Sequence, residues 1–214
     1  MLKKIMAAMC AMMLLVTTGC GTKKNDAGNT QTENGENTQQ TKTDEDVYSE
    51  KINFPIEMED GGVMKGELYP KAAPKTVENF VKLCNEKFYD GLIFHRVIPG
   101  FMIQGGGYDA DMNEKETKTI PGEFSSNGFD NPIKHERGVI SMARTQVPDS
   151  ASSQFFIMHE TSPHLDGEYA AFGKITEGLD VVDEIANTET ETYAEVFENY
   201  PKTPQVIKTI RIDK

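Results

Sequence analysis

Regular alternation of hydrophobic and polar residues begins near Lys51, and from there to its end the chain reads as one folded domain. The alternating segments 51–58 and 63–69 flank the turn sequence EDGG, which predicts a β-hairpin. Further short apolar runs follow, separated by clusters of Gly, Pro, Asn and Asp, and this spacing is typical of a β-barrel or sandwich. The strands predicted from these runs are 92–97, 101–104, 138–142, 154–158, 170–174 and 205–213.

Two segments repeat instead with the period of an α-helix. Apolar residues at i, i+3, i+4 and i+7 predict one helix over 74–87, where Pro74 suits the first turn, and a shorter helix over 178–187. We therefore expect a mainly β domain over residues 51–214, a closed antiparallel barrel with two helices covering its open ends.

The amino-terminal part follows a different pattern. Lys3 and Lys4 precede an apolar run over residues 5–16, and small residues then lead to Gly19 and Cys20, which is the layout of a secretory signal. The apolar run is shorter than the roughly 20 residues that span a bilayer as a permanent helix. The Gly-Cys pair resembles the lipobox of bacterial lipoproteins, in which the Cys receives a diacylglyceryl group and becomes the first mature residue. An ordinary signal peptide and an uncleaved anchor are the alternatives.

On this basis we expect a signal peptide over residues 1–19, lipid attachment at Cys20, and a disordered linker over the rest of 20–50, which is rich in Asn, Thr, Gln, Glu, Lys, Asp and Gly. A flexible coil of about 30 residues would hold the domain roughly 30 Å from its anchor on average. The lipoprotein hypothesis places the domain on the extracytoplasmic side of the cell membrane, attached by acyl chains.

Charge and cysteine content narrow the classes of partner. The chain has 22 basic and 34 acidic residues, a net charge of −12, and removal of residues 1–19 leaves 20 basic residues and a net charge of −14. So acidic a protein is a poor binder of polyanions, which argues against nucleic acid and against electrostatic attachment to anionic lipid. With Cys20 lipidated, Cys84 is the one mature cysteine left, so no intrachain disulfide is expected, and its helical pattern predicts a small core residue.

Motifs for metals and nucleotides are incomplete. The sequence HETSPH, residues 159–164, separates its two His residues by five positions with Pro163 between them, whereas a zinc-protease helix needs a separation of four. The sequence DADMNE, residues 109–114, lacks the Gly of a calcium loop and reads as a solvated acidic loop. The chain has no P-loop, G-x-S-x-G or C-x-x-C motif. We therefore expect no metal and no cofactor.

Residues 94–106, FHRVIPGFMIQGG, place one Arg and one Gln in an apolar run without an evident nucleophile. This segment and three others resemble, in order and spacing, the cyclophilins, a family of peptidyl-prolyl cis/trans isomerases, and the resemblance extends over about residues 51–213. The three other segments are GVISMAR (138–144), SSQFFI (152–157) and LDGEYAAFG (165–173). The resemblance implies an eight-stranded antiparallel β-barrel capped by two α-helices, which agrees with the hydrophobic pattern.

The chemistry of this family explains the Arg. Rotation about an amide C–N bond meets a barrier of roughly 18–20 kcal/mol because the nitrogen lone pair is delocalised, and no covalent bond has to break. A donor aimed at the proline nitrogen as its lone pair localises lowers this barrier. Arg96 suits the role, since it stays protonated and its donors form a rigid fork. The resemblance implies Arg96, Phe101 and Gln104 as catalytic residues, with Gln104 contacting the substrate backbone.

The resemblance also implies a pocket for the proline ring and a groove for the peptide. The residues that it assigns to substrate binding are Met102, Ala143, Arg144, Gln154, Phe156, Leu165, His164 and Tyr169. Three of them depart from the residues common in the family, because His164 stands for Trp, Tyr169 for His, and Arg144 for an Asn whose contact is through the backbone.

Positions in the ordinary barrel core are the alternative for the apolar members of this set, and a surface position is the alternative for Arg96. On a regular strand, Phe101 and Ile103 would face one way and Met102 and Gln104 the other. By the same alternation His95 would face away from Arg96, and we interpret His95 as structural.

These observations predict an enzyme that accelerates X–Pro isomerisation during the folding of exported proteins, with Pro-containing polypeptides as substrates and a monomeric domain. The alternative is a binding module, in which the same groove serves a proline-peptide-binding chaperone or a surface adhesin and turnover is incidental. The presence of Arg96 favours the enzyme.

Overall fold

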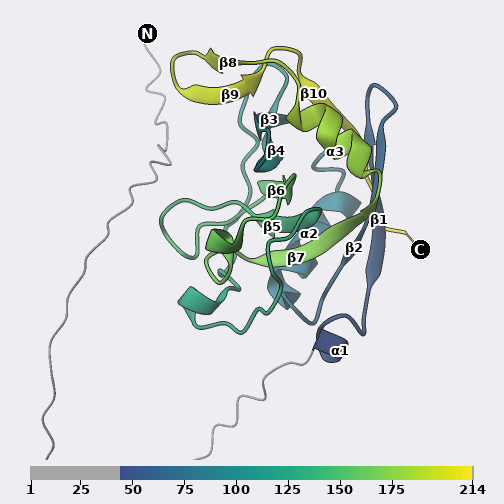
Figure 1. Ribbon diagram of the computed structural model, residues 1–214, viewed down its shortest axis with the longest axis vertical. Helices are drawn as coiled ribbons and strands as arrows, with labels where there is room; N and C mark the ends of the chain where they lie inside the picture. Colours follow the sequence, from purple (N-terminus) through teal and green to yellow (C-terminus); the bar gives the residue numbers. More distant parts are fainter. Residues whose placement is uncertain (1–43, 214) are drawn as a thin grey trace, which may run out of the picture. The chain divides into compact units, whose positions relative to one another are not determined.

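The computed structural model describes residues 44–213, and eight of the strands close into an antiparallel barrel (Figure 1). The barrel strands are β1 (Ile52–Met58), β2 (Val63–Leu68), β3 (Leu92–Ile98), β4 (Met102–Asp109), β5 (Val139–Met142), β6 (Phe155–Met158), β7 (Ala171–Glu177) and β10 (Gln205–Ile210). Their order is β1, β10, β3, β4, β6, β5, β7, β2, and β2 pairs with β1 to close the barrel. The expected closed eight-stranded antiparallel barrel is confirmed.

Two helices pack on the barrel core at the positions that the hydrophobic pattern predicts. They are α2 (Pro74–Asn85), which begins at Pro74 as expected, and α3 (Leu179–Ala186). Each helix buries its apolar stripe in the same cluster as the inward side chains of the barrel. Cys84 of α2 lies in this core as predicted, and burial raises the pKa of its thiol well above the usual value.

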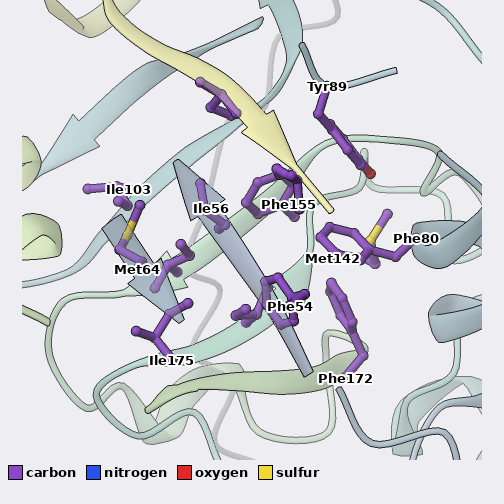
Figure 2. Packing of buried hydrophobic residues seen from close by; sticks show 14 of the residues in the cluster. Phe54, Ile56, Met64, Phe80, Tyr89, Ile103, Met142, Phe155, Phe172 and Ile175 are labelled. Atoms are coloured by element: carbon purple, nitrogen blue, oxygen red, sulfur yellow. The ribbon is translucent and has the colours of Figure 1, made fainter. Parts of the chain in front are cut away.

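Phe80 of α2 lies among aromatic side chains inside the barrel (Figure 2). The centre of its ring is 5.6 Å from the ring centres of Phe54 and Phe155, both edge-on, and 5.2 Å from that of Phe172. Aromatic pairs of this geometry contribute about 0.5–1.5 kcal/mol each beyond their buried area. Because Phe155 points inward to Phe80, its neighbour Phe156 on β6 points to the outer face of the barrel.

Ordered structure begins earlier than the sequence predicts. The helical turn α1 (Asp44–Val47) precedes the barrel, the side chain of Val47 is fully buried, and the ring of Tyr48 packs edge-on against Tyr69 at 4.7 Å. The prediction of disorder up to residue 50 is therefore wrong for this end of the linker, because apolar contacts fix it to the domain. The rest of the predicted linker, Cys20 and the predicted signal peptide lie outside the described residues.

A second hairpin, which the sequence did not predict, lies between α3 and β10. Its strands are β8 (Thr190–Tyr193) and β9 (Phe197–Pro201), drawn at the yellow end of the chain in Figure 1. The hairpin turn has Ala194 at φ 52° and Glu195 at φ 62°, a conformation that turn sequences normally supply with Asn or Gly. The hairpin is anchored on the barrel through Phe197, whose ring is 5.4 Å from that of Tyr108.

Within the part of the chain that the structure describes, no helix is both long and apolar enough to cross a membrane.

Candidate active site

A β-bulge in β3 presents Arg96 outside the barrel core. Phe94 pairs with Gly105 and Arg96 pairs with Gln104, so β3 has one more residue than β4 across this step. Phe94 and Val97 are both fully buried in the core, which regular alternation cannot achieve for two residues three positions apart. The bulge therefore leaves His95 and Arg96 together between two inward side chains, and the expectation that these two face opposite ways, which assumed a regular strand, does not hold.

His95 itself is buried, with 4% of its surface exposed, and packs edge-on against Tyr108 at 4.9 Å. Burial, with a smaller contribution from the charge of Arg96, lowers its pKa to about 4, so the imidazole is neutral near pH 7. Its Nδ1 atom has no hydrogen-bond partner among the described residues. Such a side chain suits the structural role that the sequence suggested for it.

A cross-strand row on the outer face of the barrel brings the predicted catalytic residues together. Arg96 on β3 pairs with Gln104 on β4, and Gln104 pairs with Phe156 on β6. The adjacent row along the same strands, in which Ile103 pairs with Val97 and with Ile157, points its side chains into the barrel core. Side chains of Arg96, Gln104 and Phe156 therefore stand beside one another at the spacing of adjacent strands.

Hydrogen bonds along this row orient the arginine. Nη1 of Arg96 donates to Oε1 of Gln104 at 3.4 Å, and Nε2 of Gln104 donates to Oε1 of Gln154 at 3.0 Å. Because the amide of Gln104 accepts on one side and donates on the other, its orientation is set by both partners. The side chains of Arg96, Gln104 and Gln154 are all half-buried, so this chain of hydrogen bonds lies between the protein interior and the solvent.

A second apolar cluster, separate from the barrel core, lies next to this row. Met102, Phe156 and Leu165 are its buried members near the row, with 2%, 5% and 3% of their surfaces exposed. Phe101, Ala143 and Tyr169 are partly buried and pack against it. The apolar members of the predicted site therefore belong to one cluster, which is distinct from the cluster of the barrel interior.

Phe101 departs from the predicted strand pattern. It precedes β4 in the turn that joins β3 to β4, so alternation does not apply to it, and it packs on the same cluster as Met102. Its ring stacks on that of His164 at 5.8 Å with an angle of 25° between planes. His164 is exposed to solvent. Among residues 44–213 no group of three or more His, Cys, Asp or Glu side chains could hold a metal ion.

The side chain of Arg144 is fixed within the protein. Its guanidinium lies 4.9 Å from the ring centre of Phe124 and 4.7 Å from that of Tyr169. Its Nε and Nη2 donate to the backbone oxygen of Glu168 at 3.0 and 2.9 Å, and Nη1 donates to the oxygen of Thr145 at 2.9 Å. These contacts fix the side chain of Arg144 at the rim of the site.

Two buried polar residues behind Phe156, His135 and Ser141, and the partly buried Asp166 were not found from the sequence. His135 stacks on Phe156 at 6.0 Å, its Nδ1 lies 3.1 Å from Oδ1 of Asp166, and its Nε2 lies 3.1 Å from Oγ of Ser141. Burial lowers the pKa of His135, against the opposing effect of Asp166. The connectivity is that of a Ser-His-Asp triad, but Ser141 is fully buried and His135 is 1% exposed, so no substrate reaches this serine. The cluster instead supports the ring of Phe156 from below.

The acidic loop predicted at 109–114 is closed by its first residue. The carboxylate of Asp109 accepts hydrogen bonds from the backbone of Asp111 and from the backbone and side chain of Asn113, and the side-chain bond from Asn113 is the main cause of its lowered pKa. A carboxylate engaged in its own turn agrees with the interpretation of this segment as a loop.

A guanidinium held beside an apolar pocket, on the outer face of a closed barrel, suits a protein that binds an apolar ring of an extended polypeptide and places a charged donor next to it. Similarity to known proteins agrees with this interpretation. The family described as Cyclophilin type peptidyl-prolyl cis-trans isomerase/CLD matches residues 53–212. The chain therefore belongs to the cyclophilin-type peptidyl-prolyl cis-trans isomerases, and the enzyme class expected from the sequence is confirmed.

Individual relatives support this assignment. The peptidyl-prolyl cis-trans isomerase of Acinetobacter baylyi is 45% identical over 166 residues, covering 75% of this chain and 86% of that protein. Peptidyl-prolyl cis-trans isomerase B of Bacillus subtilis is 49% identical over 130 residues, covering 61% of this chain and 87% of that protein. A crystal structure of a cyclophilin from Cryptosporidium parvum superposes with a TM-score of 0.64 at 29% identity, covering 77% of this chain and 99% of that one. The same protein, in the presence of the dipeptide Ala-Pro, gives a TM-score of 0.62.

Proposed function

We propose that the row of Arg96, Gln104 and Phe156 is the catalytic centre of this isomerase, with Arg96 as the donor that lowers the rotational barrier. The register of β3, β4 and β6 carries the proposal, because it sets these three side chains side by side on the outer face of the barrel. The proline ring of the substrate rests on the apolar cluster beside this row, against Met102 and Leu165.

The chemistry follows from the change in the proline nitrogen. In the planar amide its lone pair is delocalised and accepts no hydrogen bond, whereas in the twisted amide the lone pair is localised and accepts one. A bond from Arg96 therefore strengthens in the transition state and contributes to the rate rather than to binding alone. Each ~1.4 kcal/mol of such preferential stabilisation accelerates the reaction tenfold. Gln104 restricts the guanidinium to few orientations and offers its amide to the substrate backbone.

The remaining predicted residues form the walls of a peptide groove around this centre. Phe101 and His164 form one wall by stacking on each other, and Tyr169 packs edge-on against Phe156 at 5.6 Å on another. Ala143, Arg144 and Gln154 border the groove, and the backbone amide of Ala143 is already bonded to the oxygen of Gln154 at 2.9 Å.

A substitution in the pocket tests the assignment. Phe156→Ala should reduce both peptide binding and the isomerisation rate, since the ring contacts the substrate before and during rotation. Val63→Ala is the matched control, because Val63 is 41% exposed on β2 and belongs to neither apolar cluster. An Ala-Pro peptide assayed with both variants decides the question, and equal activities of the two would refute the pocket. Peptide binding without acceleration by the unaltered protein would instead favour the binding module.

We further propose that the protein is lipid-anchored outside the cytoplasm and acts on exported proteins. The layout of Lys3, Lys4, the apolar run, Gly19 and Cys20 supports this setting. The net charge of −12 supports an anchor of acyl chains rather than attraction to anionic lipid. Cys20→Ala should abolish incorporation of labelled fatty acid and release the protein from the membrane fraction. Unchanged labelling or membrane association of this variant would refute the anchor.

A further inference from the structure

The turn that carries Phe101 is held by residues outside the pocket. Residues 99–101 join β3 to β4, Gly100 has φ 76°, and the amide of Phe101 donates to the oxygen of Ile98 at 3.0 Å. Since Phe101 lies in this turn and not in the strand, the barrel ladder does not fix its side chain. Contacts that hold the turn of residues 99–101 in place therefore also help to hold Phe101 in its position at the wall of the pocket.

His159, which follows β6, contacts this turn with both its backbone and its side chain. Its amide donates to the oxygen of Phe101 at 2.9 Å, and its Nδ1 lies 2.9 Å from the amide nitrogen of Gly100. Its Nε2 lies 3.2 Å from Oδ1 of Asp183 on α3. The side chain of His159 is 12% exposed and that of Asp183 is 42% exposed, so the imidazole ring is largely buried while the carboxylate remains accessible to solvent.

Arg137 closes the arrangement into a network. Its Nη2 donates to both carboxylate oxygens of Asp183, at 2.7 and 2.9 Å, and its Nη1 donates to the backbone oxygen of His159 at 2.7 Å. Charge-assisted bonds of this geometry are the strong ones in proteins. We call Gly100, His159, Asp183 and Arg137 the His159 network, and it ties the turn of Phe101 to α3.

The network defines the tautomer of His159. The amide of Gly100 can only donate, so Nδ1 must be the acceptor and carry no proton. The ring proton is then on Nε2 and points at the carboxylate of Asp183. His159 in this form has one acceptor for the turn and one donor for α3, and each is used.

We propose that His159 is a positioning residue of the isomerase, which holds Phe101 against the substrate by accepting a hydrogen bond from Gly100. The proposal rests on the role proposed above for Phe101 in the pocket. His159 contacts neither the row of Arg96 nor the substrate, and acts through the turn alone. A displaced Phe101 weakens contact with the proline ring equally before and during rotation, so loss of His159 raises KM and leaves kcat nearly unchanged.

Three substitutions at His159 separate this role from general stability. His159→Leu removes both nitrogens, and we expect KM to rise about three- to tenfold, the range for one lost hydrogen bond. His159→Asn keeps an oxygen near the place of Nδ1 and should restore most of the wild-type KM. His159→Gln keeps a polar atom near the place of Nε2 only and should resemble His159→Leu. A series in which Asn and Gln behave alike, or in which kcat falls instead of KM rising, would overturn the proposal.

Nitrogen-15 NMR of the full chain provides a readout that does not depend on activity. We expect His159 to have a proton on Nε2 and none on Nδ1, with a scalar coupling across the hydrogen bond between Gly100 and Nδ1. A proton on Nδ1 would contradict the network. Phe101→Ala keeps the two possible failures apart: wild-type KM in this variant would refute the role of Phe101, whereas raised KM in Phe101→Ala with wild-type KM in His159→Leu would refute the role of His159 alone.

Discussion

Gly107 in β4 lies so close to Gln154 that adding one methyl group at this position would disturb the catalytic row and little else. A Cβ atom at Gly107 would stand 2.6 Å from Cγ and Nε2 of Gln154 and 2.7 Å from its Cδ. The backbone of Gly107 is outside the left-handed region, so Ala there brings no strain of its own. Gly107→Ala should therefore be accommodated by movement of the flexible Gln154 side chain, which breaks its bond to Gln104.

The size of the effect follows from that one bond. The amide of Gln104 donates to Gln154 at 3.0 Å, and a neutral hydrogen bond of this kind contributes about 0.5–1.5 kcal/mol. If its loss frees Gln104 from its orientation toward Arg96, kcat/KM should fall about two- to tenfold. The free energy of unfolding should change by less than about 1 kcal/mol, since only a half-buried side chain moves.

Gly105→Ala is the matched control on the same strand. There a Cβ atom would stand 2.8 Å from the backbone oxygen of Ile93 and 2.9 Å from the ring of Phe94, neither of which can move freely. We expect Gly105→Ala to destabilise the fold by roughly 1–3 kcal/mol in urea denaturation.

A double substitution isolates the mechanism. In a Gln154→Ala background the three atoms that would stand nearest to the added methyl group are absent, so Gly107→Ala should then have little further effect on kcat/KM. Equal losses from Gly107→Ala with and without Gln154 would refute the reasoning, as would wild-type activity in the single variant.

Two further predictions concern stability. Glu123 is 3% exposed and accepts hydrogen bonds from the amides of Lys75 and Thr76 at the start of α2, so Glu123→Ala should lower the free energy of unfolding by about 2–3 kcal/mol in urea. Glu78→Ala, at an exposed position of the same helix, should change it by less than about 0.5 kcal/mol, and equal effects of the two substitutions would contradict the cap. Burial lowers the pKa of His95 from 6.5 to about 4, so as the pH falls the unfolded state takes up the proton first, and the free energy of unfolding should fall by roughly 3 kcal/mol between pH 6.5 and pH 4. The decline should be smaller in His95→Phe, and an unchanged decline in that variant would show that another group is responsible.

Local sequence patterns predicted the barrel because each strand alternates or is continuously apolar. The helix predicted over 74–87 and the strand predicted over 92–97 differ from α2 and β3 by two residues or fewer at each end. The strand predicted over 101–104 differs most, since β4 continues to Asp109 through three glycines that carry no hydrophobic signal, while β7 ends three residues later and β10 three residues earlier than predicted. The hairpin of β8 and β9 was missed for a related reason, because its turn residues Ala194 and Glu195 give no turn signal.

The site could be predicted only as far as the family resemblance reached. Arg96, Gln104 and Phe156 lie in the quoted segments, and the structure adds the strand register that brings them together. His135 and His159 act through partners that are 31 and 24 positions away in the chain, Asp166 and Asp183. No local pattern encodes such pairs, and a bulge such as that at His95 depends on the partner strand in the same way.

The central claim is that Arg96 donates to the proline nitrogen as the amide twists, and exchange NMR on an Ala-Pro peptide measures this most directly. Arg96→Ala should slow catalysed interconversion by two to three decades, about 3–4 kcal/mol, while peptide binding changes little. Arg96→Lys should restore little of the rate, because a flexible ammonium has no fixed fork of donors. Interconversion near the wild-type rate in Arg96→Ala would contradict the mechanism.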